Sequence, residues 1–490
     1  MSPAAVCLAT IFAIVAVGTI VGFLAGVRRR MDLEQWTVGG RGFGVALVFL
    51  LMAGEVYTTF AFLGASGWAY SRGGPTLYVL AYLTLAYVVS FFILPQIWEA
   101  GRRHGMQTQS DFFLARYGNP WLAGCVCVVG IVCFLPYLQL QITGVGLIVS
   151  IASYDGIAPG PAMAVAVALL VAFVCVNGVR AVAWVSIVKD VLMVLAALAI
   201  GIGVPLIHFG GIGPMFQALV HAHPTHLTMP GATRNLGHAW FISTVLLTSL
   251  GFYMWPHSFA ASFTARSADT LRRNAVVMPL YTLTLAFIFF AGFAAVLVVP
   301  GLPNGDLALL TVVRQSFPPW FLGVVGGAGA LTAMVPASIF ILTAATLFAK
   351  NLYRPLFAPA MSDAQVGRLA RVTVVVLGLI SLCLALFSSP TLVSLLLTGY
   401  AGVTQFFPGV VLGLYWPRVS ARGVFAGLLA GIGGAVFLMT THRDPLFGLS
   451  AGFLALCLNF LIVVIVSLVT PAVSRERLQR PGTVAWAADA

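Results

Sequence analysis

Long runs of apolar residues dominate the sequence, and short clusters of Arg, Gly and Pro separate them. A run of about twenty apolar residues is long enough to cross a bilayer as a helix. Thirteen such segments are predicted, at residues 4–27, 44–69, 76–97, 121–151, 161–177, 181–206, 238–264, 275–299, 321–349, 372–387, 393–415, 423–439 and 449–469. The pattern therefore predicts an all-α polytopic membrane protein with about 13 transmembrane helices.

Composition supports the same class. Hydrophobic residues make up 60% of the chain, charged residues make up 8%, and the mean hydropathy is +1.02. These values lie far from those of a soluble domain. The seven cysteines all lie in apolar runs and show no spacing typical of a zinc site or a disulfide framework. We expect no cofactor and no resident metal.

The net charge of +12 arises in the short loops between the predicted spans. If the amino terminus is outside, 20 of the 25 Lys and Arg residues fall inside, four fall outside and Lys189 lies within a span. This bias follows the positive-inside rule. We expect a multi-pass protein of the inner (plasma) membrane with a cytoplasmic carboxyl terminus. Because the basic residues act as topology signals, nucleic acid is not expected as a partner.

One predicted span contains polar residues at its centre. The stretch 54–70 carries Glu55 and then Tyr57, Thr58 and Thr59, with glycines on both sides that weaken the helix. An ionisable residue at this depth is costly unless it faces a partner or a water-filled cavity. Broken backbone is likewise tolerated only where protein buries it or it lines a cavity. This stretch is a candidate functional site.

A second polar position is Lys189, which is followed by Asp190. It lies about two helical turns from the start of its span, and Ser186 shares its face of the helix. A lysine near a helix end can extend to the membrane surface. At two turns, and beside an acid, a buried functional lysine is the favoured interpretation.

Breaks are predicted in three further spans. Residues 251–257 include Tyr253 and Trp255 between a glycine and a proline, and residues 326–338 and 399–408 are also rich in Gly and Pro. The second and seventh spans are both interrupted, lie five spans apart and have opposite orientations. Paired interrupted helices of this kind mark the binding site of secondary transporters.

Two outer loops exceed a simple turn. Residues 207–237 include His221, His223 and His226, whose spacing could bind a metal, although a solvated loop is the simpler interpretation. In residues 300–320, the segment from Asp306 to Arg314 is expected to form a short surface helix.

These segments resemble the sodium:solute symporter family from about Leu47 to Arg422. The resemblance is carried, in order, by Gly64-Ala-Ser-Gly67 with Trp68-Ala-Tyr70, Asn177-Gly-Val-Arg-Ala-Val-Ala-Trp184, Trp255-Pro-His257 with Arg266 and Arg272-Arg273, Leu342–Tyr353, and Thr404–Trp416. It implies a LeuT-type fold of five-plus-five inverted repeats, in which the span that contains residues 64–70 is the unwound first core helix, with its break near Thr58. The implied units are residues 1–43 with an extra helix, the repeats 44–206 and 238–422 around the outer loop 207–237, two helices in 423–470, and a cytoplasmic tail at 471–490.

The sequence departs from that family's pattern at the sodium site. Family members that use sodium follow a Met with two hydroxyl residues, whereas Met334 is followed here by Val335 and Pro336. In sodium-free transporters of this fold, a basic residue on the fifth core helix can occupy the vacated site, which is where Lys189 lies. This combination resembles the monocarboxylate-permease branch, as does the stretch 137–141.

The leading hypothesis is a secondary active transporter that imports a small organic solute, most simply a monocarboxylate such as lactate or pyruvate, by alternating access with protons. Glu55 would be either the counter-ion of Lys189 or a second proton site. The expected substrate-binding residues are Tyr57, Thr58, Thr59, Tyr137, Gln141, Tyr253 and Trp255. The expected coupling residues are Glu55, Ser186, Lys189, Asp190, Val335, Pro336 and Ser338.

Two alternatives remain open. The first is a sodium-coupled symporter of an amino acid or another small solute, in which Glu55 binds an ammonium group. The second is a solute sensor without transport. An enzyme is not expected, because no set of metal ligands and no nucleophile–base pair is visible within the spans. The partners expected are the solute, a coupling cation and the lipid bilayer, and the oligomeric state is left open.

Overall fold

The structure is a computed structural model that describes residues 1–26, 38–176, 179–233, 235–388 and 390–473. Three features of the sequence lie outside the described residues: the basic run 28–30, the pair 177–178 and the tail from 474 onward. The regular secondary structure of the described chain is helical.

The helices follow one another through short connections. In chain order they are α1 (Pro3–Gly26), η1 (Gly39–Arg41), α3 (Val45–Val56), η2 (Phe60–Gly64), α4 (Ala65–Ser71), η3 (Gly74–Leu77), α5 (Tyr78–His104), α6 (Gln109–Tyr117), α7 (Pro120–Ala152), α8 (Pro159–Val176), α9 (Val179–Phe209), α10 (Ile212–Ala222), α11 (His238–Gly251), η4 (Phe252–Met254), α12 (Pro256–Ser262), α13 (Ala268–Thr282), α14 (Leu285–Val298), η5 (Gly305–Leu307), α15 (Ala308–Ser316), α16 (Pro319–Thr346), η6 (Leu347–Tyr353), α17 (Arg354–Phe357), α18 (Asp363–Phe387), α19 (Leu392–Val403), η7 (Thr404–Phe406), α20 (Phe407–Tyr415), α21 (Ala421–Thr440) and α22 (Ala451–Val469).

Ten helices within the described residues are long and apolar enough to cross a membrane, and the bent pair α3–α4 raises this to eleven. The shorter apolar helices α8 and α11 occupy the two remaining predicted segments. The all-α polytopic architecture is therefore confirmed, whereas the count of thirteen crossings stays a prediction.

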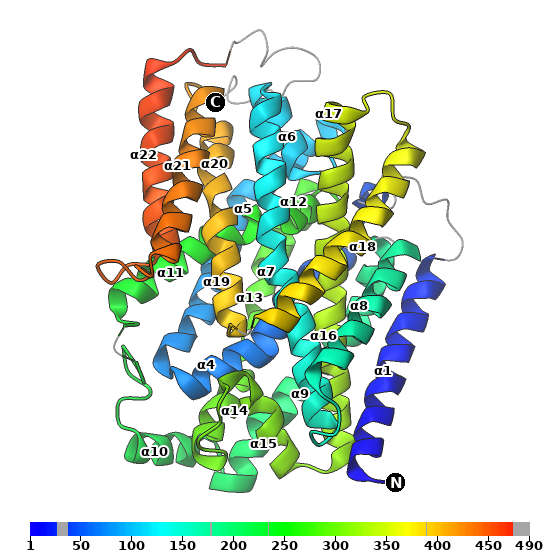
Figure 1. The fold of residues 1–490 in the computed structure, drawn as a ribbon. Helices are drawn as coiled ribbons and strands as arrows, with labels where there is room; N and C mark the ends of the chain where they lie inside the picture. The colour runs from blue at the N-terminus through cyan, green and yellow to red at the C-terminus, as the bar shows by residue number, and fades with distance from the viewer. Residues whose placement is uncertain (27–37, 177–178, 234, 389, 474–490) are drawn as a thin grey trace.

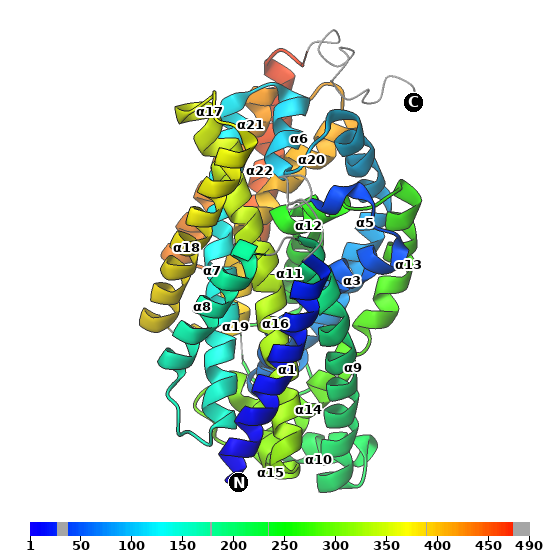
Figure 2. The same ribbon diagram turned by 90° about the vertical axis from the view of Figure 1, so that its right-hand side faces the viewer.

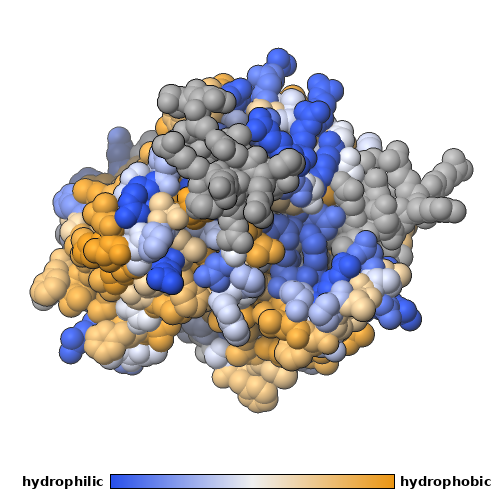
Figure 3. All heavy atoms as spheres, turned by 90° about the horizontal axis from the view of Figure 1, so that it is seen from above, coloured by the Kyte–Doolittle hydropathy of each residue, from blue (hydrophilic) through white to orange (hydrophobic). Residues whose placement is uncertain are grey.

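The long helices stand roughly side by side as a bundle with two distinct ends (Figures 1 and 2). The end that carries α6 and α17 is called the upper end, and the end that carries α10 and α15 is called the lower end (Figure 1). Helix α1 starts at the lower end, and α22 finishes at the upper end. Seen from above, hydrophilic side chains gather across the upper end, with hydrophobic ones along parts of its rim (Figure 3).

The sides of the bundle expose large apolar side chains to the surroundings. Examples on different helices are Phe12, Val132, Leu169, Val376 and Leu461. In water such a surface would be costly, whereas in a bilayer the acyl chains are equally apolar. The exposed faces fit a protein whose sides contact lipid.

The predicted break in residues 326–338 is wrong, because α16 runs without interruption from Pro319 to Thr346. The glycines there serve close helix packing: a Cβ on Gly326 would lie 2.7 Å from Ile11, and one on Gly327 would lie 2.9 Å from Ile14. Small residues let two membrane helices approach closely, so these glycines admit α1 rather than bend α16.

The outer loops are more ordered than predicted. Residues Ile212–Ala222 form α10, and the expected helix after Asp306 is present as η5 and α15. That helix is not confined to the surface, because Asp306, Leu309 and Val313 are buried.

Candidate functional site

The first interrupted helix breaks at Tyr57 and Thr58. Helix α3 ends at Val56, Tyr57 is extended with φ −84° and ψ 90°, and the chain resumes as the π-helix η2 and then α4. The axis bends by 52° across this break. The break is present beside Thr58, as predicted, and residues 64–67 are helical. Gly67 packs against Gly305 and Asp306, where a Cβ would come within 3 Å of both.

The second interrupted helix breaks at Trp255, as the sequence predicts. Helix α11 ends at Gly251, a short 3₁₀ turn covers residues 252–254, and Trp255 adopts φ −57° and ψ 128° before Pro256 begins α12. A proline at the first helical position lacks the amide that would be unpaired there in any case. This break therefore leaves backbone groups of both half-helices outside the regular helical hydrogen-bond pattern.

Lys189 binds the backbone that the first break leaves unpaired. Its Nζ donates to the carbonyl oxygens of Gly54, at 2.7 Å, and Tyr57, at 3.1 Å. It also forms an ion pair of 2.9 Å with Asp190 Oδ1, and the Lys189 side chain is fully buried. The carbonyl end of a helix carries partial negative charge, so a cation is favoured there. Lys189 thus does not extend to the membrane surface.

Asp190 joins the break to the neighbouring helix α13. Its Oδ1 accepts a hydrogen bond of 3.1 Å from the Tyr281 hydroxyl. The ring of Tyr57 packs edge-on against Tyr281, and its hydroxyl contacts the Thr284 hydroxyl. Tyr57 therefore belongs to the cluster around Lys189 and Asp190.

A glycine in the last turn before each break lets a second helix approach. A Cβ on Gly54 would lie 2.8 Å from Ser186 Oγ on α9, and one on Gly251 would lie 2.0 Å from Thr404 Oγ1 in η7. Each approaching helix also donates a hydrogen bond to a carbonyl oxygen near the break. Lys189 Nζ donates to Gly54 O, and Thr404 Oγ1 donates to Leu247 O at 3.2 Å. A close contact at a glycine and a hydrogen bond to a carbonyl oxygen therefore join the first core helix to the fifth, and the sixth to the tenth.

Glu55 lies in the last turn of α3 and faces α12. Its Oε2 accepts a hydrogen bond of 2.7 Å from Ser258 Oγ and lies 3.7 Å from His257 Nε2. All three side chains are buried. Glu55 therefore connects the upper halves of the two interrupted helices, while the ion-pair partner of Lys189 is Asp190.

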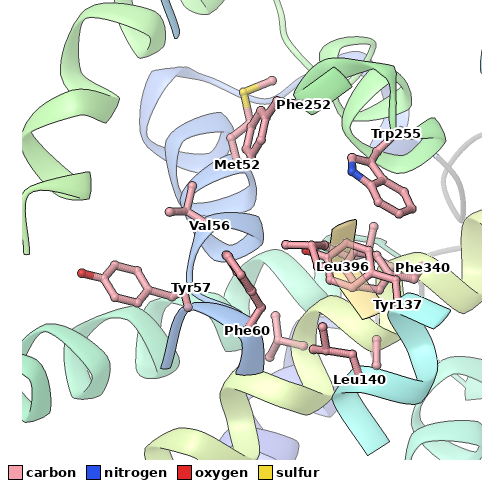
Figure 4. Close-up of a cluster of buried hydrophobic side chains, with 14 of the residues drawn as sticks. Met52, Val56, Tyr57, Phe60, Tyr137, Leu140, Phe252, Trp255, Phe340 and Leu396 are labelled. Carbon is pink, nitrogen blue, oxygen red and sulfur yellow. The ribbon is translucent and has the colours of Figure 1, made fainter. Parts of the chain in front are cut away.

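An aromatic cluster faces the two breaks. The ring centroid of Tyr137 on α7 lies 4.8 Å from that of Trp255 and 4.1 Å from that of Phe340 on α16. In Figure 4, Met52 and Phe252 lie across from Tyr137 and Phe340. The ring of Tyr57 points away from these residues. Tyr253 is buried beside Phe252, with ring centroids 4.9 Å apart.

Polar groups without a partner collect beside the aromatic cluster. Gln141 Oε1 accepts hydrogen bonds from the Thr59 amide, at 3.2 Å, and the Thr59 hydroxyl, at 2.7 Å. Within the described chain, Gln141 Nε2, Thr58 Oγ1 and Trp255 Nε1 are buried and make no hydrogen bond of 3.5 Å or less, although Thr58 interacts with Tyr137 and Trp255 with Tyr400. A buried donor without a partner costs about 1–3 kcal/mol, so these groups are suited to receive a polar ligand.

The remaining predicted coupling residues are two apolar side chains and two serines. Val335 and Pro336 are buried within α16 and have apolar side chains. The hydroxyl of Ser338 donates to Met334 O, and that of Ser186 donates to Val182 O, each within its own helix. Across the described residues, no group of three or more His, Cys, Asp or Glu side chains could hold a metal ion, and this includes the histidines of residues 221–226.

Sequence reasoning missed Gln109. It lies at the start of α6, and its Nε2 donates to Met254 O at 3.0 Å, just before the second break. Asp111, two residues later, accepts from Lys350 Nζ and from Asn351 Nδ2, both at 2.7 Å. Burial alone would raise the pKa of Asp111, but Lys350 and these hydrogen bonds lower it below its ordinary value. The capping box from Thr108 to Asp111 predicts the start of α6 and could have drawn attention to it.

A helix bundle in which two helices break at mid-length and carry buried polar groups at the breaks is typical of a secondary transporter. The profile of the sodium:solute symporter family matches residues 36–431, and the chain belongs to that family. It is a multi-pass membrane symporter that moves a small solute with a coupling cation.

Relatives and solved structures agree with this assignment. A Bacillus subtilis protein named "Uncharacterized symporter YhjB" is 45% identical over 473 residues, which cover 94% of this chain and 96% of that protein. A Rhizobium johnstonii "Monocarboxylate transport permease protein" is 28% identical, with 93% and 95% covered. The structure of a sodium-coupled sialic acid symporter superposes with a TM-score of 0.80 at 17% identity, covering 96% of this chain and 99% of that one. The fold is therefore of the LeuT type.

Proposed function

We propose that this protein imports a small monocarboxylate, such as lactate or pyruvate, together with protons. The observation that carries the proposal is the contact of the Lys189 ammonium group with the Gly54 and Tyr57 carbonyl oxygens at the first break. A fixed side-chain cation there can do what a bound sodium ion would do, which is to stabilise unpaired carbonyl groups.

Protonation of Lys189 couples to the shape of the first interrupted helix. A protonated ammonium group holds the carbonyls of Gly54 and Tyr57 together, whereas a neutral amine has no charge with which to attract them. Burial disfavours the charged form of a lysine, and Asp190 at 2.9 Å restores it. Gain and loss of one proton can therefore tighten and release the break in each transport cycle.

Sodium is the less favoured coupling ion. A sodium site requires several oxygen ligands, and Val335 and Pro336 provide none from their side chains. The Lys189 ammonium group also occupies the carbonyl oxygens that a sodium ion would need.

The polar groups beside the aromatic cluster suit a small carboxylate. Gln141 Nε2, Thr58 Oγ1 and Trp255 Nε1 can donate to its oxygen atoms, and Pro256 places the amino end of α12 next to Trp255. The rings of Tyr137 and Phe340 provide an apolar wall for a short carbon chain. The name of the Rhizobium relative supports the same class of substrate. In this proposal Tyr57 acts through the coupling cluster rather than on the substrate.

The orientation follows from the charge bias. We place the upper end in the cytoplasm and the lower end outside, in the plasma membrane, because the predicted inner loops carry most of the Lys and Arg residues. The inverted repeats then comprise residues 44–206 and 238–422.

A counterflow screen in proteoliposomes tests the substrate class. Vesicles loaded with unlabelled lactate, pyruvate, proline or choline are diluted into a trace of the same labelled compound, at pH 6 and pH 8, with and without sodium. We expect exchange of the monocarboxylates at either sodium level. Exchange only of amino acids or amines, and only with sodium, would contradict the proposal.

A further inference from the structure

A small cavity lies between α3, α12 and α16, on the upper side of the first break. It measures about 20 Å³, and its lining includes Glu55, His257, Thr264 and Thr343. A volume of this size holds a water molecule but no organic solute. The cavity is therefore too small to hold the proposed substrate.

Two residues that line this cavity each carry a buried polar atom without a hydrogen-bond partner in the described chain. Among the described residues, Glu55 Oε1 and His257 Nδ1 are buried and have no hydrogen-bond partner, and both residues line the cavity. The relative exposures of Glu55 and His257 are 4% and 3%. Buried polar atoms that protein does not satisfy are commonly satisfied by an ordered water, which needs at least two polar partners.

The cavity lies on the upper side of Glu55. Leu51, one turn above Glu55 on α3, lines it, and so do Thr264 and Thr343. The Thr264 carbonyl accepts a hydrogen bond from the Phe43 amide, in the segment that precedes α3. In the proposed orientation a proton that leaves Glu55 through this cavity moves toward the cytoplasm.

We propose that this cavity binds one water molecule that connects Glu55 to His257, and that the coupling proton leaves toward the cytoplasm through this water. The inference rests on the proposed proton coupling and adds a second protonation site to it. The proton on Glu55 Oε1 passes to the water oxygen while the water gives one of its own protons to His257 Nδ1. The water is regenerated, the carboxylic acid becomes a carboxylate, and the neutral imidazole becomes an imidazolium.

Two contacts offset part of the cost of burying the charges that this transfer creates. A neutral His257 that accepts at Nδ1 carries its hydrogen on Nε2, which lies 3.7 Å from Glu55 Oε2. After the transfer the imidazolium and the carboxylate face each other across that distance as an ion pair. Ser258 Oγ, at 2.7 Å from the same carboxylate oxygen, adds a hydrogen bond. The imidazolium can then lose its proton once α12 moves away from α3.

The other charged and titratable groups nearby are already engaged or aromatic. Lys189 on α9 is paired with Asp190. The ring of Tyr137 on α7 lies 6.2 Å from that of His257, and on α5 the Tyr87 hydroxyl accepts from Thr282 Oγ1. Helix α16 contributes Ile339, Leu342 and Thr343 to the cavity, none of which titrates. Glu55 and His257 are therefore the proton-exchanging pair of this cavity.

Two variants separate the proposed relay from folding and substrate binding. His257→Asn removes the group that receives the proton, and Thr343→Leu fills the cavity while leaving both Glu55 and His257 in place. Thr343→Val, which keeps the volume, is the matched control for the second variant. His208→Asn, on the far end of α9, is the control for loss of a histidine.

The experiment compares pyruvate counterflow, which needs no net proton movement, with pyruvate accumulation driven by a pH gradient in the same proteoliposomes. We expect both variants to keep counterflow within twofold of the unmodified protein and to lose at least tenfold in gradient-driven accumulation. Both controls should keep both activities. If gradient-driven accumulation survives in either variant, the relay is overturned. The relay is also overturned if both variants lose counterflow together with gradient-driven accumulation.

A second measurement does not depend on the substrate. In purified protein, the infrared carbonyl band of protonated Glu55 is identified by its loss in Glu55→Gln. We expect this band to shift in His257→Asn and in Thr343→Leu but not in Thr343→Val. An unchanged band in both variants would overturn the water site. If the unmodified protein shows no pH-driven accumulation at all, the proposed proton coupling fails. The infrared band of Glu55 in the two variants then still tests whether a water molecule binds in the cavity.

Discussion

The ammonium nitrogen of Lys189 lies 2.7 Å from the carbonyl oxygen of Gly54, 135 residues earlier in the chain. This contact holds the fifth core helix against the point where the first core helix is broken. Because Asp190 pairs with the same ammonium group, the break, the cation and the anion form one buried unit.

Removal of the Lys189 charge should destabilise the protein. In Lys189→Met the carboxylate of Asp190 would stay buried without its cation, and loss of one partner of a buried pair costs about 3–5 kcal/mol. The double variant with Asp190→Asn should recover part of that loss. Thermal unfolding of purified protein measures both effects. Equal stability of the single variant and the unmodified protein would show that Asp190 does not need this cation.

A methyl group at Gly54 should separate α3 from α9. Because its Cβ would lie 2.8 Å from Ser186 Oγ, we expect Gly54→Ala to lower the free energy of unfolding by about 1–3 kcal/mol. Ser186→Gly in the same protein should restore part of it. Gly124→Ala is the control, because Gly124 lies within α7 with open space around its Cα. There alanine should leave stability unchanged or raise it by up to about 1 kcal/mol.

Asp306 should make the lower end of the protein sensitive to pH. Burial raises the pKa of this carboxyl group to about 6, although a hydrogen bond from the Leu392 amide lowers it. The folded state therefore binds more protons than the unfolded state between pH 4 and pH 6. Its stability is highest below that window and falls as the pH rises through it.

Asp306→Asn keeps an acceptor for the Leu392 amide without a charge. Relative to this variant, the unmodified protein should gain about 1 kcal/mol of stability when the pH is lowered from 7 to 5. Unfolding midpoints at the two pH values, with hydrogen exchange at Leu392, measure the difference. The same pH dependence in both proteins would contradict a raised pKa of the buried Asp306 carboxyl group.

The sequence predicts much of this architecture because a bilayer imposes simple rules on length and composition. The break at Trp255 was predictable, since Pro256 cannot continue the helix before it. The glycines at 326–329 misled the prediction, because a glycine that admits a neighbouring helix and a glycine that bends its own helix look alike in sequence. Only the packed structure separates these two uses.

Contacts between distant segments were beyond sequence reasoning. Lys189 was recognised as a candidate, but its carbonyl partners are backbone atoms that carry no sequence pattern. Gln109 was missed for the same reason, since it bonds to Met254 O. The roles of His257 and Ser258 beside Glu55 depend on two helices that meet only in the folded chain.

Gln141 should determine affinity for the substrate. Gln141→Glu keeps the oxygen that accepts from Thr59 but replaces the amide donor with an oxygen that repels a carboxylate. We expect KM for pyruvate to rise at least tenfold, which corresponds to about 1.4 kcal/mol. The control is Gln139→Leu, two residues away, because Gln139 Nε2 bonds to Ser388 Oγ instead. An unchanged KM in Gln141→Glu, or an equal rise in the control, would remove Gln141 from the substrate site.

The central claim is that a proton acting on Lys189 takes the place of a sodium ion. Pyruvate uptake into proteoliposomes under an imposed pH gradient, with no sodium present, tests it most directly. We expect accumulation above equilibrium in the unmodified protein, none under a sodium gradient alone, and none with Lys189→Met under either gradient. Accumulation driven by sodium and retained in Lys189→Met would contradict it.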